Sequence, residues 1–397
     1  MAYRTGRINR MNTLQTLTGK QIVVAVTGSI AAVEVVKLIH SLKRRGAVVQ
    51  AVMSAAATGI ISPEALTYAS GRETITRLTG KVEHVSYCGD EGTADLLLIA
   101  PCTANTISKI ACGIDDTPVT TFATTALGSR IPVLIVPAMH HSMFRHPGLT
   151  DNIRRIREWG VEVLEPRVEE GKAKFVDSEE IVLQCERAIL GQPLAGKRIL
   201  ITSGPCREEV DDVRVLTTRS TGLMGRALAL QAFRLGADVT VVHRDRFPCV
   251  RNIRVESAGE MGTAVLHYFS EEPGADIYVS AAAVSDFAPE RVKGKVPSGK
   301  PVSLELVPLP KLLDAVVQRW APLTIAFKLG TAQENKARAM LEKGVAMVLL
   351  NSPETMGSSD GEYVLITGKK ERMHLIGNKD EIAKDVWEEI ITDFSHT

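Results

Sequence analysis

The sequence predicts an α/β protein with two doubly wound parallel-sheet domains. Its 397 residues leave room for two or three folded units of about 150 residues each. A short β-rich run stopped by small residues occurs twice, at 21–29 and at 198–204. In both halves strand patterns then alternate with helical patterns, as in parallel sheets that carry helices on both faces. Gly and Pro residues at 191–196 end a helical pattern and mark the boundary between the halves.

The hydrophobic pattern assigns the elements in order. In the first half it predicts strands at about 21–26, 47–53, 95–100, 132–136 and 161–164, and helices near 31–45, 62–70, 103–112, 148–158 and 178–190. In the second half it predicts strands near 198–202, 238–243, 276–280, 302–306, 323–327 and 346–350, and helices near 222–235, 258–270, 310–319, 332–343 and 379–394. Residues 288–300 are expected to form a functional loop and 362–375 an edge hairpin. We expect a flexible tail at 1–18 and domains at 19–191 and 192–397.

Composition excludes several classes of protein. Forty-seven Lys and Arg against 46 Asp and Glu give a net charge of +1, so no overall field would attract nucleic acid or an anionic membrane. The six cysteines contain no CxxC pair, which argues against a disulfide framework or structural zinc and favours a reducing compartment. No apolar run is long enough for a membrane span, and the basic start lacks the features of a secretory signal. A cytoplasmic protein without nucleic-acid or membrane partners is expected.

Two predicted strands in the first half end in small and hydroxyl-bearing residues. Residues 27–32, Thr-Gly-Ser-Ile-Ala-Ala, open a helix whose free N–H groups and dipole suit a phosphate, although small residues at such a turn also serve packing alone. Residues 100–105, Ala-Pro-Cys-Thr-Ala-Asn, occupy the corresponding place after the strand at 95–100. Since parallel strands end at one edge of their sheet, the two segments define a crevice.

Histidines occur at two further places near this edge. His84 precedes the strand at 95–100, where an imidazole can accept a proton at neutral pH, although a lone histidine is often an ordinary surface residue. Residues 137–144, Pro-Ala-Met-His-His-Ser-Met-Phe, follow another apolar strand. Metal binding by His140 and His141 is disfavoured because adjacent positions rarely face one ligand and no carboxylate joins them. A ligand-contacting loop is the better interpretation.

These segments together resemble the flavin-binding cysteine decarboxylases. The resemblance implies a flavodoxin-like fold, FMN as the cofactor, trimeric assembly and 4′-phosphopantothenoylcysteine as the substrate. It also implies His84 as the catalytic base and substrate contacts from Met139, His140 and His141. The residues implied to bind FMN are Gly28, Ser29, Ile30, Ser54, Thr103, Ala104, Asn105 and Lys109. In this family the flavin takes a hydride and returns it, so no external redox partner is needed.

The sequence departs from this family at two positions. His140 replaces the usual Asn after Pro-Ala-Met, and one imidazole nitrogen cannot both donate and accept as an amide does, so His141 is expected to share the task. The flap at 170–175 lacks the usual proton-donating Cys. We hypothesise that Lys172 or Lys174 donates the proton. Both departures resemble the archaeal-type members.

The second half presents an anion-binding pattern of its own. Residues 202–208 leave the first strand as an extended turn, and residues 217–225, Thr-Thr-Arg-Ser-Thr-Gly-Leu-Met-Gly, lead into a helix. The N–H groups, hydroxyls and arginine there suit a phosphate or carboxylate, although helix capping alone is an alternative. Asp286 follows a buried strand, where it can hold a cation or a sugar hydroxyl or cap a helix. Lys293 and Lys295 lie on the loop that can close over a triphosphate, although loop lysines are mostly solvated.

The second half resembles phosphopantothenate–cysteine ligase. The motifs are 199–225, 281–287, 294–296, 308–313, 326–328 and Asn351. The resemblance implies a Rossmann-like domain in which CTP, with Mg²⁺, activates the carboxylate of 4′-phosphopantothenate before cysteine displaces CMP. Thr218, Arg219 and Ser220 would bind substrate, and Asp286 would also contact the metal. The residues implied for the nucleotide are Ser203, Gly204, Ala283, Asp286, Lys295, Phe327 and Lys328.

The second half differs from the ligase family at two positions. Thr218 replaces an Asn and Gly330 an acidic residue, yet Thr218 keeps a hydroxyl donor and we predict a working ligase. The order of the halves resembles the bifunctional, archaeal-type enzymes of coenzyme A biosynthesis. A homo-oligomer is expected, in which the decarboxylase halves form trimers and the ligase halves form dimers. A dodecamer would contain both kinds of contact.

The sequence supports three other interpretations less well. A nicotinamide oxidoreductase is disfavoured because GxGxxG and its acidic partner are missing. His84 argues against a non-catalytic flavin-binding regulator. A flavin prenyltransferase would leave the second half unexplained.

Overall fold

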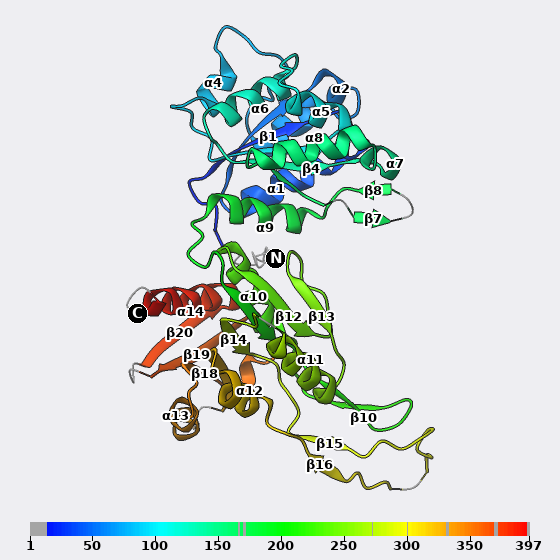
Figure 1. The fold of residues 1–397 in the computed structure, drawn as a ribbon, viewed down its shortest axis with the longest axis vertical. Coiled ribbons are helices and arrows are strands. Elements are labelled where there is room, and N and C mark those ends of the chain that lie inside the picture. Colours follow the sequence, from blue (N-terminus) through cyan, green and yellow to red (C-terminus); the bar gives the residue numbers. More distant parts are fainter. Residues whose placement is uncertain are drawn as a thin grey trace, which may run out of the picture. The chain divides into compact units, whose positions relative to one another are not determined.

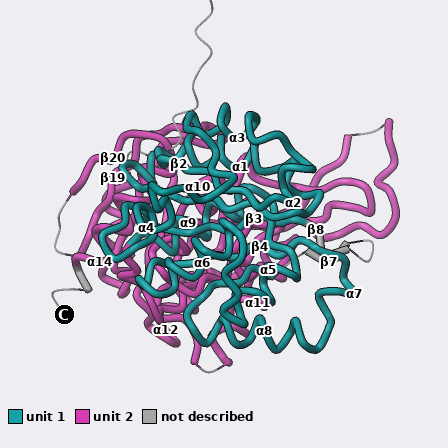
Figure 2. Tube along the Cα trace, turned by 90° about the horizontal axis from the view of Figure 1, so that it is seen from above, with its two compact units in different colours: residues 1–190 teal, residues 191–397 magenta. Residues whose placement is uncertain are grey.

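The structure is a computed structural model that describes residues 14–165, 167–169, 172–271, 273–299, 301–330, 333–368 and 372–394, with the backbone alone for 167–169, 172–174, 393 and 394. The chain forms two compact units, Met1–Leu190 and Gly191–Thr397, which are coloured separately in Figure 2. The Leu17 side chain is fully buried in the core of the first unit, so the packed part of the chain begins before residue 19 and the predicted tail 1–18 extends too far. Residues 1–13 of that tail lie outside the described residues.

A parallel five-stranded sheet with the order β2-β1-β3-β4-β6 forms the centre of the first unit. This is the flavodoxin-like order, with the chain reversing direction across the sheet between β1 and β3. The strands, whose buried positions are apolar apart from Gln50, are β1 (Gln21–Val26), β2 (Val48–Met53), β3 (Leu96–Cys102), β4 (Val133–Pro137) and β6 (Glu162–Val163). The predicted fold class is confirmed for this half.

Helices cover both faces of this sheet (Figure 1). Alternate residues of the strands point to opposite faces, so each strand contributes to two separate cores. One face carries α1 (Val35–Arg44), α3 (Pro63–Ser70) and α9 (Ser178–Ile189). The other carries α4 (Glu83–Cys88), α5 (Ala104–Ala111), α6 (Pro118–Gly128) and α8 (Pro147–Glu158). Short pieces complete the unit: η1 (Ile30–Glu34), α2 (Ala55–Thr58), β5 (Met139–His140), α7 (His141–Phe144), β7 (Arg167–Glu169) and β8 (Lys172–Lys174).

The second unit contains an eight-stranded sheet with the order β13-β12-β9-β14-β17-β18-β19-β20. Its first six strands are parallel and follow the Rossmann order, and its last two are antiparallel. The strands are β9 (Arg198–Thr202), β12 (Asp238–His243), β13 (Arg251–Arg254), β14 (Ile277–Ser280), β17 (Leu323–Leu329), β18 (Met347–Asn351), β19 (Asp360–Thr367) and β20 (Arg372–Asn378). The Rossmann-like expectation and the predicted edge hairpin are both confirmed.

In the described part of the second unit, five α-helices pack on this sheet, and one short 3-10 helix lies in a connection. Leu200, Val242 and Tyr278 of the sheet form one core with α11 (Ala258–Ser270) and α12 (Leu312–Trp320). The indole N–H of Trp387, in the last helix of this unit (Lys379–Phe394), donates to the carbonyl of Leu228, in the first helix (Leu223–Arg234), at 3.0 Å. This hydrogen bond links the two helices. The remaining helices are α10 (Leu223–Arg234), α13 (Glu334–Glu342), α14 (Lys379–Phe394) and the short η2 (Pro353–Thr355). In the described part of the chain, no helix is long and apolar enough to span a bilayer.

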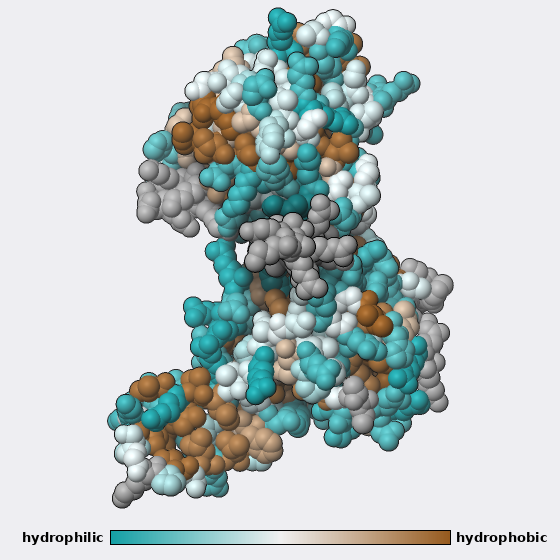
Figure 3. Space-filling view, turned by 180° about the vertical axis from the view of Figure 1, so that it is seen from behind, coloured by the Kyte–Doolittle hydropathy of each residue, from teal (hydrophilic) through white to brown (hydrophobic). Residues whose placement is uncertain are grey.

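Two antiparallel ribbons extend from the second unit (Figure 1). They pair β10 (Arg207–Glu209) with β11 (Val215–Thr217), and β15 (Phe287–Pro289) with β16 (Leu306–Pro308). Apolar side chains are exposed along both ribbons, and Figure 3 shows a patch of this kind. The exposed side chains are Val213, Val215, Leu216, Phe287, Val292, Val302, Leu304, Leu306 and Val307.

Some predicted elements were wrong. The segment 302–306 is not a strand of the main sheet, because its apolar residues precede the ribbon strand β16 and stay exposed. The sheet instead gains β13, whose polar sequence Arg-Asn-Ile-Arg suits an edge position. The helix α6 was missed because its alternating Thr and Ala residues give little amphipathic pattern, although the Thr117 capping box and Pro118 mark its start.

Candidate functional site

A cavity of about 420 Å³ lies at the carboxyl edge of the first sheet. It is lined by residues that directly follow β1, β2, β3 and β4, because parallel strands bring their ends to the same edge. Seven of the eight residues predicted to bind FMN line it: Gly28, Ser29, Ser54, Thr103, Ala104, Asn105 and Lys109. The eighth, Ile30, is 77% exposed and is not among the lining residues. Met139 and His140, predicted to contact substrate, also line the cavity.

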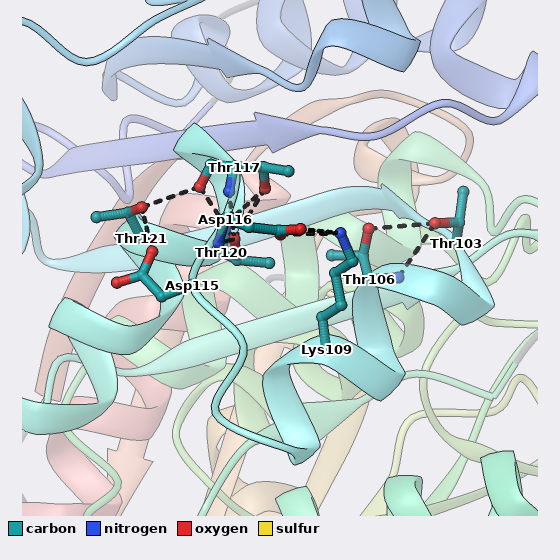
Figure 4. A network of polar contacts seen from close by, with 8 residues as sticks. All are labelled: Thr103, Thr106, Lys109, Asp115, Asp116, Thr117, Thr120 and Thr121. Atoms are coloured by element: carbon teal, nitrogen blue, oxygen red, sulfur yellow. Dashed lines mark hydrogen bonds and ion pairs between the residues drawn. The ribbon is translucent and has the colours of Figure 1, made fainter.

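Figure 4 shows a network of threonine hydrogen bonds and one ion pair that includes four of the lining residues, Thr103, Thr106, Lys109 and Thr117. Thr103 caps α5 by accepting from the Thr106 N–H, and its own N–H donates to Thr27 Oγ1 at 3.0 Å. Lys109 Nζ donates to both carboxylate oxygens of Asp116, at 2.6 and 2.8 Å. The predicted flavin contact Lys109 is therefore held by a carboxylate that the sequence analysis did not single out.

Elsewhere in the cavity lining, Gly28 packs closely against Ala56, and the Ser54 hydroxyl has no hydrogen-bond partner in the described structure. A Cβ added at Gly28 would lie 2.6 Å from Ala56 Cβ and 3.2 Å from the Ala56 carbonyl carbon, so only glycine fits. Ser54 Oγ is buried and has no hydrogen-bond partner in the described structure. A buried hydroxyl without a partner is unfavourable, and an acceptor on a bound ligand would satisfy it.

The predicted base His84 lies elsewhere. It is in the helix α4, rather than in the polar connection expected from the sequence, and it does not line the cavity of its own chain. Its Nδ1 atom is buried without a hydrogen-bond partner in the described structure, as is Nδ1 of His141 at the start of α7. The fold therefore places Met139 and His140 around the same cavity as the residues predicted to bind flavin, but it does not place His84 there.

The flap pairs with the Met139–His140 segment. Strand β5 is antiparallel to β8, with His140 opposite Lys172 and Met139 opposite Ala173. The side chains of Lys172 and Lys174, as well as residues 170 and 171, lie outside the described part of the structure. The backbone alone therefore places the proposed proton-donor positions beside a cavity-lining strand.

A second cavity, of about 150 Å³, lies at the carboxyl edge of the second sheet. The predicted residues Ser220, Ala283 and Phe327 line it. Ser203 is buried beneath it and donates to the Gly222 carbonyl at 3.2 Å. The remaining lining residues are Thr221, Gly222, Leu223, Met224, Gly225, Ala281, Ala282, Leu329, Asn351, Thr355, Met356, Gly357, Tyr363 and Lys379.

Other predicted ligase residues do not line this cavity. Arg219 and Lys295 are exposed, Lys328 is half-buried, and Gly204 contacts Ala283 through a backbone hydrogen bond of 3.0 Å. Thr218 Oγ1 is buried without a partner in the described structure.

Asp286 forms an ion pair with Lys311 at 2.5 Å and its side chain is 61% exposed. In the described residues no group of three or more His, Cys, Asp or Glu side chains is placed to hold a metal. The surroundings of Asp286 therefore do not form a magnesium site made by protein ligands alone.

A buried carboxylate holds the segment that carries Lys295. Asp211 accepts hydrogen bonds from the N–H groups of Val213, Arg214 and Val296, and from the Arg214 guanidinium at 2.6 Å. These donors lower the pKa of Asp211 to about 2, the Val296 N–H having the largest effect. The two residues next to Lys295 are thereby fixed against the β10–β11 connection, since Asp212 also accepts from the Gly294 N–H.

Comparison with known proteins identifies the family. The model described as Flavoprotein matches residues 10–190, and the DNA/pantothenate metabolism flavoprotein C-terminal domain matches residues 194–394. The Coenzyme A biosynthesis bifunctional protein CoaBC of Thermococcus kodakarensis is 45% identical over 94% of this chain and 95% of its own. The chain belongs to the CoaBC family. CoaBC proteins of Methanocaldococcus jannaschii (35% identity, 94% of each chain) and Vibrio vulnificus (33%, 96% of this chain and 100% of its own) are also similar.

Membership of the CoaBC family confirms the two resemblances and their order along the chain. It decides against the oxidoreductase, regulator and prenyltransferase interpretations, because one family accounts for both halves. The roles of individual residues stay predictions. No sequence motif points to Asp116, Thr355, Tyr363 or Lys379, because each reaches its site from a segment that carries no motif of its own.

Proposed function

We propose that this chain catalyses two consecutive steps of coenzyme A biosynthesis. The unit ending at residue 190 would decarboxylate 4′-phosphopantothenoylcysteine to 4′-phosphopantetheine and CO₂, using FMN. The following unit would first make that substrate from 4′-phosphopantothenate and cysteine with CTP. Family membership over nearly the whole chain supports both steps. The observation that carries the proposal is the clustering of seven predicted flavin residues around one cavity.

The residues of the first cavity suit FMN. Ser54 Oγ offers an unused buried hydroxyl, and the N-termini of α2 and α5 supply backbone N–H groups for a phosphate. Glycine at position 28 lets Ala56 of α2 pack closely against the turn after β1, which borders the cavity. When bound, FMN supplies reversible hydride transfer. The chain's own residues position the substrate, with Met139, His140 and His141 as proposed contacts.

Proton transfer in the first half is assigned to His84 and the flap. We propose His84 as the base that takes the thiol proton, and Lys172 or Lys174 as the later proton donor. Because His84 does not line the cavity of its own chain, the proposed trimer would have to present it to the cavity of a neighbouring copy. Mixing inactive His84→Gln and Gly28→Ala proteins should then restore some activity, and no recovery would contradict the shared site.

The second cavity is the proposed site of carboxylate activation. The pantothenate carboxylate would attack the α-phosphorus of CTP, releasing pyrophosphate, and the cysteine amine would then displace CMP. Ser203, Gly204, Ala283, Asp286, Lys295, Phe327 and Lys328 are the proposed nucleotide contacts, and Thr218, Arg219 and Ser220 the substrate contacts. Mg²⁺ enters as part of the nucleotide substrate, neutralising phosphate oxygens.

We propose a cytoplasmic homo-oligomer. Exposed apolar side chains on the ribbons of the second unit support a subunit contact there, since exposed apolar patches usually mark interaction sites. We propose that copies of the chain form dimers through the ligase unit and trimers through the decarboxylase unit. Sedimentation of the intact protein tests both.

One assay tests the whole proposal. Purified protein receives 4′-phosphopantothenate, cysteine, Mg²⁺ and either CTP or ATP, and pyrophosphate and CO₂ are followed separately. We expect both products, a faster reaction with CTP, and a yellow protein that loses CO₂ release by about 10²–10⁴-fold in His84→Gln. A colourless protein that refuses added FMN would refute the first half. An acyl-nucleotide that accumulates without amide formation would show that Thr218 disables the second.

A further inference from the structure

Lys379 is a buried lysine that lines the second cavity. It is the first residue of α14 and only 7% exposed, although lysine is among the residues least often buried. The residue reaches the cavity from late in the chain, more than 150 positions after Leu223, Met224 and Gly225, the residues of α10 that line the cavity. Neither the motifs of the ligase half nor the proposed nucleotide contacts include it.

The ammonium of Lys379 is incompletely paired. Nζ has three N–H donors and, among the described residues, makes one hydrogen bond, to the Thr355 carbonyl at 3.3 Å. In the described part of the chain it has no ion-pair partner within 4.0 Å. Burial lowers the pKa of Lys379, with the nearby Asp360 charge acting in the opposite direction. A buried cation without a counter-ion is unfavourable, and an anion beside it would remove much of that cost.

The rest of the cavity lining also favours an anion. The helix α10 begins here after Gly222, and no side chain caps its N-terminus, which leaves backbone N–H groups and the positive end of the helix dipole at the cavity. The loop that accepts the Lys379 hydrogen bond lies close to this helix start. A Cβ built on Gly357 of that loop would be 3.9 Å from Thr221 Cγ2.

The Lys379 side chain is held in place by its neighbours. Thr355, whose carbonyl accepts from Lys379, also accepts through its hydroxyl from the Asn351 amide at 2.8 Å. That hydroxyl in turn donates to the Ser352 carbonyl at 2.8 Å. The backbone N–H of Lys379 donates to the Ser359 carbonyl at 3.0 Å. A cation fixed in this way needs little reordering when a ligand binds, which favours affinity.

We propose that Lys379, together with the N-terminus of α10, binds a phosphate group of the nucleotide co-substrate in the second cavity. This assignment rests on the proposed ligase function and adds a binding residue to it. The ammonium neutralises phosphate oxygens in a cavity that is partly shielded from water, where a charge-assisted hydrogen bond is stronger than at the surface.

The test uses the intact protein with Lys379→Met, Lys379→Arg and the control Lys343→Met. Lys343 lies in the same unit but is exposed and paired with Asp314. Binding of CTP is measured by calorimetry and binding of cytidine, which has no phosphate, by saturation-transfer NMR. We expect Lys379→Met to weaken CTP binding by about 10- to 100-fold, with cytidine binding unchanged. Lys379→Arg should restore most of the CTP affinity, and Lys343→Met should behave like the unmodified protein.

Stability and the other activity separate this role from a purely structural one. Removing an unpaired buried charge should leave the melting temperature equal or higher, whereas a structural lysine would lower it. Decarboxylation should be unaffected. The assignment is overturned if Lys379→Met binds CTP within twofold of the unmodified protein, if cytidine affinity falls in parallel, or if affinity falls for 4′-phosphopantothenate instead. An unmodified protein that binds no nucleotide would refute the proposed function itself, and the assignment with it.

Discussion

The two cavities occupy the same place in two similar sheets, yet they are assembled differently. In the first unit the predicted ligand residues follow β1, β2 and β3 directly and lie together around one cavity. In the second unit Ala283 follows β14, but Ser220 precedes α10 and Phe327 lies within β17. Asp286 and Lys295 lie on the segment between β14 and β16 and do not line the cavity.

The difference shows how far a parallel sheet controls the position of a side chain. Hydrogen bonding between strands fixes the residues immediately after each strand, whatever their sequence. Farther along a connection, position depends on particular side chains, such as Asp211 for the Lys295 segment. We therefore expect the first site to be sensitive to packing around the sheet edge and the second to depend also on remote polar contacts.

The largest expected effect concerns the flap of the first site. Replacing both Lys172 and Lys174 by Ala should slow decarboxylation by about 10²–10⁴-fold, because a proton donor is lost. Double replacement by Arg keeps the charge but not an easily released proton, so it should not restore the rate. Stopped-flow measurement of CO₂ release checks this, with ligase activity as the internal control. Normal decarboxylation in the Ala protein would sink the hypothesis.

Packing at the first sheet edge comes next. The added methyl group of Gly28→Ala would meet Ala56 Cβ at 2.6 Å and displace α2, which carries Ser54 at its start. We expect FMN affinity to fall by about 100-fold, from the cost of overpacking. Gly128→Ala is the matched control, because its Cβ would have no neighbour within 4 Å. Flavin absorbance after gel filtration distinguishes the two, and a fully yellow Gly28→Ala protein would contradict the close approach.

The corresponding change in the second unit should have a somewhat smaller effect. In Gly225→Ala the new Cβ would lie 2.2 Å from Ser203 Oγ and 2.6 Å from Ser203 Cβ. Rotation of the hydroxyl relieves the first contact but not the second. Pyrophosphate release should fall by about 30-fold while decarboxylation is retained. Gly262→Ala in α11 adds a methyl group in open space and should leave both activities intact. Equal behaviour of the two variants would show that the Ser203 contact does not shape the second site.

The smallest effect is expected from Asp211→Asn. The amide keeps one acceptor oxygen, but its NH₂ group cannot accept from the two donors that the other carboxylate oxygen serves, and the charge is lost. The Lys295 segment is then held less firmly, and the KM for CTP should rise by about tenfold. Hydrogen exchange at the Val296 N–H should accelerate in parallel. An unchanged KM alongside faster exchange would mean that the Lys295 segment does not contribute to nucleotide binding.

Low pH should have part of the effect of Asp211→Asn, because protonation removes the charge of Asp211. The folded pKa of Asp211, about 2, lies below its ordinary value of 3.8, so its stabilising contribution is present above pH 4 and is lost as the pH falls towards 2. Acid unfolding of the Asn protein should therefore show a weaker pH dependence over this range.

Much of the first site was predictable because its residues are contiguous with strands. Gly28, Ser54 and Thr103 each follow a clear apolar run, and the alternation of strands and helices requires those runs to end at one edge. The Lys109–Asp116 pair was not predictable, since Asp116 lies in the connection to α6, a helix that shows almost no amphipathic pattern.

The sequence by itself determined the two parallel sheets, their order along the chain and the segments that border each cavity, because hydrophobic periodicity and small residues at strand ends are local properties. The tertiary structure alone decided that His84 lies outside its own chain's cavity and that Lys379 lines the second one. It also decided that Asp211 holds the Lys295 segment. These contacts join residues far apart in the chain, and local sequence patterns do not determine which distant segments come into contact.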